Sequence, residues 1–415
     1  MELKNEYDVV VVGGGAAGIM AAISAAREGK NVLLLEKLPK IAQKLKATGG
    51  GRCNLTNTLN NEEFIARFGK DGRFMQDALR SFDHKDLVIF FDEIGVQTHA
   101  PDGFRIFPTS HSSTTIIDAL VNELQRLGVT ILTNQRAQRI LFHANHIAGI
   151  KTQTDTFYAS SIILATGGMG YPQLGAQGDG YTLASEVGHK ITQIYPAMMP
   201  LKTKEKWVSN CRADTIAKVQ LRVALKKHKK LKATGDLIFT KNGIRGPVVL
   251  DFAREITPLL QKYGEVPLLA SFTKGMNQQE LFEYIQEQYK KDTQQTIEDI
   301  LSTLLPASLA HEIIKLANID PQTKYKKIEG KKKEQLLSLL HATPLHITGH
   351  DGFAMAMITR GGISLKEIDP KTMQSRRVLG LYFCGEVVNL DGPCGGYNLQ
   401  WSFSSGYLAG KLLQT

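Results

Sequence analysis

Cysteine is scarce in this chain, which has only four in 415 residues: Cys53, Cys211, Cys384 and Cys394. No two of them are spaced as a CxxC pair or as a metal clip. A disulfide scaffold is therefore excluded, and a reducing cytoplasm is expected. The same spacing argues against a disulfide reductase, whose chemistry needs two neighbouring cysteines.

Long apolar runs are also missing. No run approaches the roughly 18 residues that a membrane-spanning helix needs, and the polar start of the chain lacks the basic and apolar regions of a secretory signal. The histidines His99, His346 and His350 do not have the spacing of metal ligands, so no metal site is expected. With 42% hydrophobic and 22% charged residues, the sequence predicts a globular cytoplasmic protein without membrane association. At about 150 residues per domain, it is long enough for two or three domains.

Positive charge is abundant and local, within a formal net charge of +10. The stretch from Lys202 to Lys232 holds eleven Lys and Arg against two acidic residues, a net charge of +9. Residues 324–334 hold six Lys against two Glu, a net charge of +4, which leaves the rest of the chain at about −3. Two interpretations stay open. The basic region could bind a polyanion such as RNA, or its lysines could only solvate an exposed face.

Hydrophobic periodicity predicts a parallel sheet at both ends of the chain. The run from Val9 to Val12 is β-branched, as in strands that are buried on both faces of such a sheet. We expect strands over 9–12, 32–36, 129–132, 161–165 and 380–384, a hairpin over 147–152 and 156–160, and helices over 16–27, 112–127 and 398–413.

The pattern changes after Pro200. Apolar residues then alternate with polar ones from Val219 to Leu225, the period of a half-buried antiparallel strand. A short strand is expected over 237–240, and helices over 247–256, 278–291, 297–304 and 309–316. The sequence therefore predicts an α/β fold in which a Rossmann domain, formed by 1–195 and 346–415, is interrupted by an inserted domain, 196–345, that is β-rich over 196–272 and helical over 273–345.

A glycine-rich turn follows the first predicted strand. Gly13, Gly15 and Gly18 have the GxGxxG spacing that allows a tight turn, close approach to a pyrophosphate and close packing of helix on strand. Glu36 ends the second predicted strand, where it can accept hydrogen bonds from both hydroxyls of an unphosphorylated adenosine ribose. The unit predicts a site for the ADP half of FAD or NAD, and a structural turn without a ligand is the less favoured alternative.

Further glycine clusters favour FAD over NAD. They lie at 46–57, 165–168, 380–386 and 391–398, and they provide backbone amides for an extended cofactor. The helix that begins near Asn398 would stabilise negative charge on a reduced flavin through its partial positive charge. No second GxGxxG follows a strand, so NAD(P)H, if it is the reductant, is expected to dock transiently at the flavin.

Five sequence blocks resemble the aminoacetone oxidase-like flavoprotein family (BaiN and RdsA type), within the wider glutathione reductase-like FAD folds. The blocks are GRCNLTN at 51–57, FRIFPTS at 104–110, GDLIFTKNGIRGP at 235–247, ITRGGI at 358–363, and GEVVNLDG with GGYNLQWSFSSG at 385–406. The resemblance covers nearly the whole chain and implies an FAD-dependent oxidoreductase with a barrel-like and helical insert. Cys394 departs from the family pattern, which often has Thr at that position.

The motifs and the resemblance together imply a set of FAD contacts along the chain. They are Gly13, Gly15, Ala16, Ala17, Gly18, Glu36, Lys37, Gly50, Gly51, Arg52, Thr166, Gly167, Gly385, Glu386, Gly396, Tyr397, Asn398 and Leu399.

Three residues are candidates for catalysis, and each has a structural alternative. Cys53, in a loop expected near the isoalloxazine, could donate a proton or be a packed thiol. Arg52, like Arg105, could orient an anionic or carbonyl-rich substrate or form an ordinary loop salt bridge. Tyr397 could stack on flavin or substrate, or it could be a core aromatic.

Three functions are compatible with these features. The first is reduction of a uridine in ribosomal RNA to dihydrouridine, which the resemblance allows and the basic insert favours. The second is oxidation or reduction of a small molecule, such as an amine oxidised with O2 or an enone reduced, with lysines that serve only solvation. The third is an FAD-stabilised RNA-binding protein without turnover. RNA or a small molecule is the partner expected for these three functions, and the oligomeric state is left open.

Overall fold

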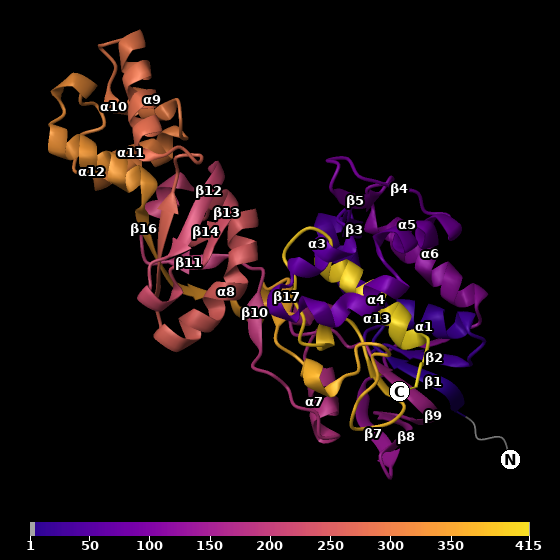
Figure 1. Ribbon diagram of the computed structural model, residues 1–415. Coiled ribbons are helices and arrows are strands. Elements are labelled where there is room, and N and C mark those ends of the chain that lie inside the picture. Colours follow the sequence, from indigo (N-terminus) through magenta and orange to yellow (C-terminus); the bar gives the residue numbers. More distant parts are fainter. Residues whose placement is uncertain (1–4, 415) are drawn as a thin grey trace. The chain divides into compact units, whose positions relative to one another are not determined.

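The computed structural model describes residues 5–414, which form two compact units (Figure 1). Unit 1 contains the chain up to Pro196 and again from Ala356, and unit 2 is Ala197–Met355. The second boundary lies after residue 355, whereas the sequence placed it after 345. The difference arises because β16 (Thr343–His350) is a strand of the inserted barrel.

Unit 1 is built on a seven-stranded sheet. Its order is β6 (Thr130–Leu132), β2 (Val32–Leu35), β1 (Glu6–Val12), β9 (Thr156–Leu164), β8 (His146–Thr152) and β7 (Ala137–His143), and β18 (Leu381–Phe383) also pairs with β9. β1 is parallel to both β2 and β9, and β9 is parallel to β18. Residues Val9–Val12 are at most 5% exposed, as their β-branched run predicted.

One strand of this sheet differs from expectation. The sequence predicted a hairpin arm over 156–160 and a separate strand over 161–165. The structure has a single strand, β9, whose first half pairs with β8 and whose second half pairs with β18. Hairpin and parallel sheet are therefore joined in one continuous element.

Helices and short strands complete unit 1. The helices are α1 (Ala16–Arg27), α2 (Gln43–Ala47), α3 (Asn61–Ala66), α4 (Gln76–Ser81), α5 (His84–Glu93), α6 (Ser113–Arg126), α7 (Asp179–Glu186) and α13 (Tyr397–Gly410). A three-stranded sheet is formed by β3 (Thr56–Asn57), β5 (Arg105–Pro108) and β4 (Thr98–His99), and β10 (Tyr195–Ala197) pairs with β17 (Ile358–Arg360). α13 lies directly against α1, because Gly406 has no side chain to separate its backbone from the Ala17 carbonyl (Figure 1).

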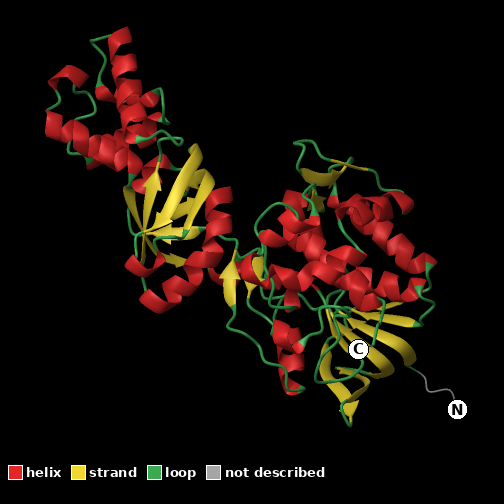
Figure 2. Cartoon of the chain, viewed as in Figure 1, coloured by secondary structure: helices red, strands yellow, loops and turns green. Residues whose placement is uncertain are grey.

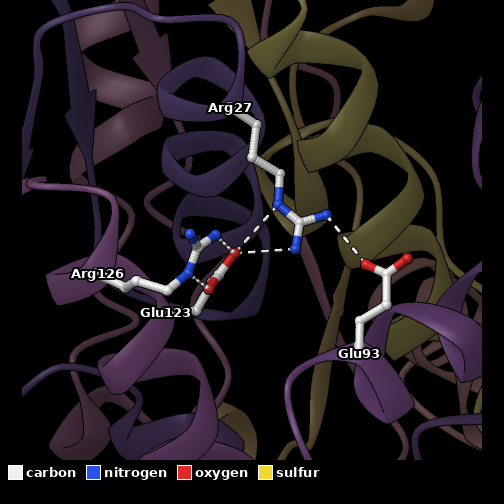
Figure 3. A network of polar contacts seen from close by, with 4 residues as sticks. All are labelled: Arg27, Glu93, Glu123 and Arg126. Atoms are coloured by element: carbon white, nitrogen blue, oxygen red, sulfur yellow. Dashed lines mark hydrogen bonds and ion pairs between the residues drawn. The ribbon is translucent and has the colours of Figure 1, made fainter.

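A network of charged side chains joins three of these helices (Figure 3). Glu123 of α6 is 5% exposed and accepts hydrogen bonds from Arg126 at 2.7 Å and from Arg27 of α1 at 2.9 Å. Arg27 also pairs with Glu93 of α5 at 3.4 Å. The hydrogen bond from Arg126, together with Arg27, holds the pKa of Glu123 below its usual value. The buried carboxylate is thus compensated and fixes α6 against α1.

Unit 2 has its own core and two parts (Figure 2). The first is a closed barrel in the order β11 (Leu201–Thr203), β14 (Gly243–Arg245), β13 (Lys232–Phe239), β12 (Thr215–Val223), β15 (Val266–Ser271) and β16, with α8 (Pro247–Tyr263). The second is a helical part formed by α9 (Gln278–Lys291), α10 (Ile297–Ser302), α11 (Ala307–Leu316) and α12 (Gly330–His341). The predicted alternation is present in β12, where Val219, Leu221 and Val223 are buried.

Between residues 5 and 414, no helix has both the length and the apolar character needed to cross a membrane.

Candidate cofactor site

The turn between β1 and α1 has the geometry of a pyrophosphate cradle. A Cβ added to Gly13, where φ is +108°, would lie 2.6 Å from the Ala165 carbonyl oxygen, and one added to Gly18 would overlap the Gly13 carbonyl. In contrast, a Cβ at Gly15 would meet nothing within 4 Å, and no side chain caps the helix that starts at Ala16. The start of α1, with Ala16 and Ala17, therefore faces open space with its backbone amides, as an anion site requires.

Glu36 is held at the end of β2 beside this turn. Its Oε2 accepts from the Gly14 amide at 2.9 Å, and its Oε1 accepts from the Leu38 amide at 2.8 Å. A carboxylate has about four lone-pair positions, so both oxygens keep capacity for further donors. This placement fits a residue that accepts hydrogen bonds from ribose hydroxyls.

Glycine segments far apart in the sequence converge on the same turn. A Cβ at Gly385 would lie 2.7 Å from the Ala17 Cβ, and a Cβ at Gly168 would lie 2.6 Å from Glu386 Oε1. The Oγ1 atom of Thr166, beside Gly167, is buried and has no hydrogen-bond partner within the described residues. An orphaned hydroxyl at this position is consistent with a partner supplied by a bound molecule.

Glu386 is fixed by two contacts that the sequence did not reveal. Lys44 of α2 pairs with its Oε2 at 2.6 Å, and the Thr359 amide donates to its Oε1 at 2.8 Å. Tyr181 of α7 is 7% exposed, and its pKa is raised by burial and by the negative charge of Glu386. Lys44 precedes the glycine loop, but its pairing with a residue 342 positions away has no local sequence signal.

The loop before Cys53 is a run of left-handed glycines. Gly49, Gly50 and Gly51 have φ of +58°, +66° and +87°, which glycine adopts without steric cost, and a Cβ at Gly50 or Gly51 would meet no protein atom within 4 Å. Cys53 itself is 0% exposed, and burial raises its pKa to about 11. The structure thus gives Cys53 the surroundings of a packed, protonated thiol.

The start of α13 is shaped by its neighbours. Gly396 has φ of +86°, and no side chain caps the helix. The Asn398 side chain accepts from the Gly392 amide and donates to the Gly392 carbonyl at 2.9 Å, so it fixes the preceding loop, and Leu399 is only partly buried. Tyr397 is 4% exposed, with its ring centroid 4.9 Å from that of Phe64. This is the core-aromatic alternative predicted for Tyr397.

The charged group of one predicted residue, Lys37, is engaged elsewhere. Lys37 pairs with Asp179, which Arg136 also contacts at 2.6 Å, and Lys37 donates to Gln177 at 3.1 Å. Its ammonium is therefore engaged with α7 and with the residues just before that helix. A contact between Lys37 and a cofactor through its backbone remains a proposal.

Two arginines share one aromatic ring at the surface of unit 1. The guanidinium carbon of Arg52 lies 5.4 Å from the Phe107 ring centroid and that of Arg105 lies 5.9 Å from it. Both side chains are exposed. Arg52 Nε donates to the Gly49 carbonyl, and Arg105 Nε donates to Asp102 at 2.6 Å, which with the Arg105 amide lowers the pKa of that carboxyl to about 2. Of the guanidinium nitrogens of Arg52, only Nε has a hydrogen bond among the described residues, and the side chain is exposed.

No group of three or more His, Cys, Asp or Glu in the described part of the chain could hold a metal ion. His99 and His111 do lie close, with ring centroids 4.6 Å apart, but they form an aromatic pair and not a ligand set. The arrangement of unit 1 instead matches an extended dinucleotide. It offers an open helix start for a pyrophosphate, a carboxylate for a ribose and a glycine loop with free space. The residues present thus fit FAD.

Comparisons with known proteins agree with this geometry. The family model described as the HI0933-like protein Rossmann domain matches residues 7–412. A 3-dehydro-bile acid delta(4,6)-reductase from Clostridium scindens is 32% identical over 97% of this chain and 97% of its own length. The Ribosomal RNA dihydrouridine synthase of Escherichia coli is 28% identical, again over 97% of each chain. A 3-ketosteroid-delta4-(5alpha)-dehydrogenase from Rhodococcus jostii shares the fold with a TM-score of 0.52 and 17% identity, over 99% of this chain and 96% of that one.

Proposed function

Because this chain belongs to the HI0933-like family of FAD-binding Rossmann proteins and is an FAD-dependent oxidoreductase, we propose that it reduces a carbon–carbon double bond next to a carbonyl, and that its leading substrate is a uridine in ribosomal RNA. NAD(P)H is the proposed reductant. The product would be dihydrouridine, as for the relatives named Ribosomal RNA dihydrouridine synthase.

The observation that supports RNA most directly is the charge of unit 2. This unit holds 25 Lys and Arg against 17 Asp and Glu, a net charge of +8 within the chain's +10. A domain with such an excess attracts a polyanion at long range and holds it through phosphate contacts. A small neutral substrate gains nothing from this charge.

The residues of unit 1 have separate roles in the proposed reaction. FAD, when bound, would supply a hydride to one carbon of the double bond, and uptake of a proton by the other carbon would complete the reduction. The uncapped start of α13 stabilises negative charge near it. Arg52, whose side chain is exposed, orients a carbonyl or a phosphate of the substrate. The target base must first leave its stack, at a cost of a few kcal/mol.

The second candidate is a small 3-oxo compound with a conjugated double bond. The 32% identity to the 3-dehydro-bile acid delta(4,6)-reductase favours it. The chemistry is the same in outline, because both substrates carry an alkene conjugated to a carbonyl. The lysines of unit 2 would then serve solvation alone. Because the chain is an oxidoreductase, we set aside a role in RNA binding without turnover.

The experiment tests the two candidate substrates separately. Purified protein with FAD is incubated with NADH or NADPH and either unmodified ribosomal RNA transcripts or a 3-oxo-4-ene steroid. We expect nucleoside mass spectrometry to find dihydrouridine in the RNA, and the same nucleoside to be missing from ribosomal RNA of a strain that lacks the gene. Turnover of the steroid without any dihydrouridine would make the second candidate the function.

A further inference from the structure

We propose that the outer face of the β12–β13 hairpin is the surface on which RNA docks; this inference rests on the function proposed above. The hairpin patch is defined by six cations: Arg222, Lys226, Lys227, Lys229, Lys230 and Lys232. All six side chains are exposed. Four of them lie in the connection between the strands, which contains the short 3-10 helix η5 (Lys226–His228).

The positive charge of the hairpin patch is not neutralised by acidic residues of the hairpin. From residue 215 to residue 235 the sequence contains seven Lys and Arg and no Asp or Glu. No ion pair within residues 5–414 involves any of the six cations. Two other lysines of the barrel are paired: Lys202 with Asp351, and Lys204 with Glu265 at 3.3 Å. The charge of the patch is therefore available to an external anion.

The register of the hairpin concentrates this charge. Arg222 of β12 lies directly opposite Lys232 of β13, and both are exposed, whereas Leu221 and Val223 on either side of Arg222 are buried. Like charges directly opposite each other destabilise a sheet. A phosphate placed between the two side chains would convert the repulsion into two attractive contacts.

An exposed aromatic side chain lies beside the patch and distinguishes RNA from other polyanions. Tyr263, at the end of α8, is 40% exposed. His228 of η5 contacts it, with 3.3 Å between Nε2 and the hydroxyl and 5.9 Å between ring centroids. Lys262 lies 5.1 Å from the same ring centroid. Single-stranded nucleic acid is bound by this combination of cations along the backbone and an aromatic ring on which a base stacks.

The helical part of unit 2 differs from the hairpin patch in its balance of charge. Residues 273–342 hold ten Lys against ten Asp and Glu, so the net charge of +4 over 324–334 is balanced nearby. Lys324 contacts Gln294 at 2.6 Å, and Lys333 lies 4.3 Å from the Tyr325 ring centroid. The barrel with its flanking residues holds 15 Lys and Arg against seven acidic residues, so the entire excess of +8 belongs to it.

The test removes four charges from each part of unit 2 in the full-length, FAD-loaded protein. The first variant is Lys226→Gln, Lys227→Gln, Lys229→Gln and Lys230→Gln. The matched control is Lys326→Gln, Lys327→Gln, Lys331→Gln and Lys332→Gln, which changes the net charge equally. The probe is a labelled ribosomal RNA transcript, titrated at several salt concentrations, with flavin absorbance as the measure of an intact unit 1.

We expect the slope of log affinity against log salt to flatten by up to about three units in the first variant, since each phosphate contact contributes about 0.7 to 0.9. The control should keep nearly the wild-type slope. Equal slopes in the two variants, or RNA binding by the first variant with the wild-type slope, overturn the inference. Wild-type protein that binds vesicles of anionic lipid but no RNA overturns it as well.

A second variant separates stacking from charge. Tyr263→Ala should weaken RNA binding by about five- to a hundredfold through loss of one stacked base, while the salt slope stays unchanged because no charge is removed. Tyr263→Phe keeps the ring and should bind nearly as wild type. Unchanged affinity in Tyr263→Ala excludes the ring from the docking surface and leaves a polyanion site without selectivity for RNA, against the proposal.

Failure of this inference and failure of the proposed function give different results. If wild-type protein forms dihydrouridine but the first variant has the wild-type salt slope and KM for RNA, the function stands and the docking surface is elsewhere. If wild-type protein binds RNA through the patch but forms no dihydrouridine, the docking surface stands and the proposed substrate is wrong.

Discussion

The cofactor site of unit 1 and the hairpin patch of unit 2 recognise their ligands by different physical means. Unit 1 presents backbone amides, glycines and one carboxylate, and a Cβ added at Gly13 or Gly18 would collide with a backbone carbonyl. Unit 2 presents six exposed cations on one hairpin. The first kind of site depends on the position of individual atoms, and the second depends on a sum of charges. Substitutions should therefore act abruptly in unit 1 and gradually in unit 2.

The largest effect is expected from Gly18→Ala. The new Cβ would overlap the Gly13 carbonyl, so α1 would move away from the turn and FAD binding would be lost. The matched control is Gly330→Ala, where a Cβ would meet nothing within 4 Å and φ is not positive. We expect purified Gly18→Ala to be colourless and Gly330→Ala to hold one flavin per chain, as measured by absorbance. A yellow Gly18→Ala protein with wild-type FAD content would contradict the expectation that single substitutions in unit 1 act abruptly.

A smaller effect is expected from Glu36→Ala. The two hydrogen bonds from the ribose hydroxyls to the carboxylate are worth roughly 1.5 to 3 kcal/mol each, so their loss should lower FAD affinity by at least about a hundredfold. Glu36→Gln keeps one acceptor oxygen and should lie between wild type and Glu36→Ala. Titration of apoprotein with FAD measures both. Equal affinity in all three proteins would show that the ribose lies away from Glu36.

The smallest effect is expected from Cys53→Ala. With a pKa raised by burial to about 11, the Cys53 thiol is a weak acid between pH 7 and pH 9, and its side chain is 0% exposed. We therefore expect turnover to change by less than about threefold, and alkylation by iodoacetamide in this pH range to be slow in the folded protein. Loss of a general acid would instead cost about a hundredfold or more. If turnover of Cys53→Ala fell by that much while its FAD content stayed unchanged, Cys53 would have to be the proton donor.

The nucleotide-binding part of the fold could be predicted because its signals are local. A β-branched run, three spaced glycines and an acidic residue at the end of β2 all lie between Val9 and Glu36. The helix predicted over 16–27 is α1, and the one predicted over 278–291 is α9. Local composition also predicted a change of architecture after Pro200, although barrel closure was implied only by the resemblance.

The remaining features depend on contacts between distant residues. β16 closes the barrel against β11 and β15. Leu345 and Ile347 alternate with polar residues, as in a half-buried antiparallel strand, but nothing within Thr343–His350 indicates which strands it pairs with. The pairing of Lys44 with Glu386 and the burial of Tyr397 against Phe64 are equally non-local. The charge balance of the helical part of unit 2 could be counted from the sequence, because the predicted bounds 273–345 enclose the same ten Lys and ten Asp and Glu.

The pairing of β11 with β16 also bears on how the inserted unit can be handled. Leu201, near the start of unit 2, is a direct partner of His350, near its end. A domain whose two ends are neighbours in one sheet can be cut out or moved to another protein, because a short linker is enough to join the two ends. Residues 197–355 should therefore be portable as a cassette. A flavoprotein of the same architecture without a basic insert could receive these residues. If that chimera gains RNA binding, the docking surface lies on the inserted unit.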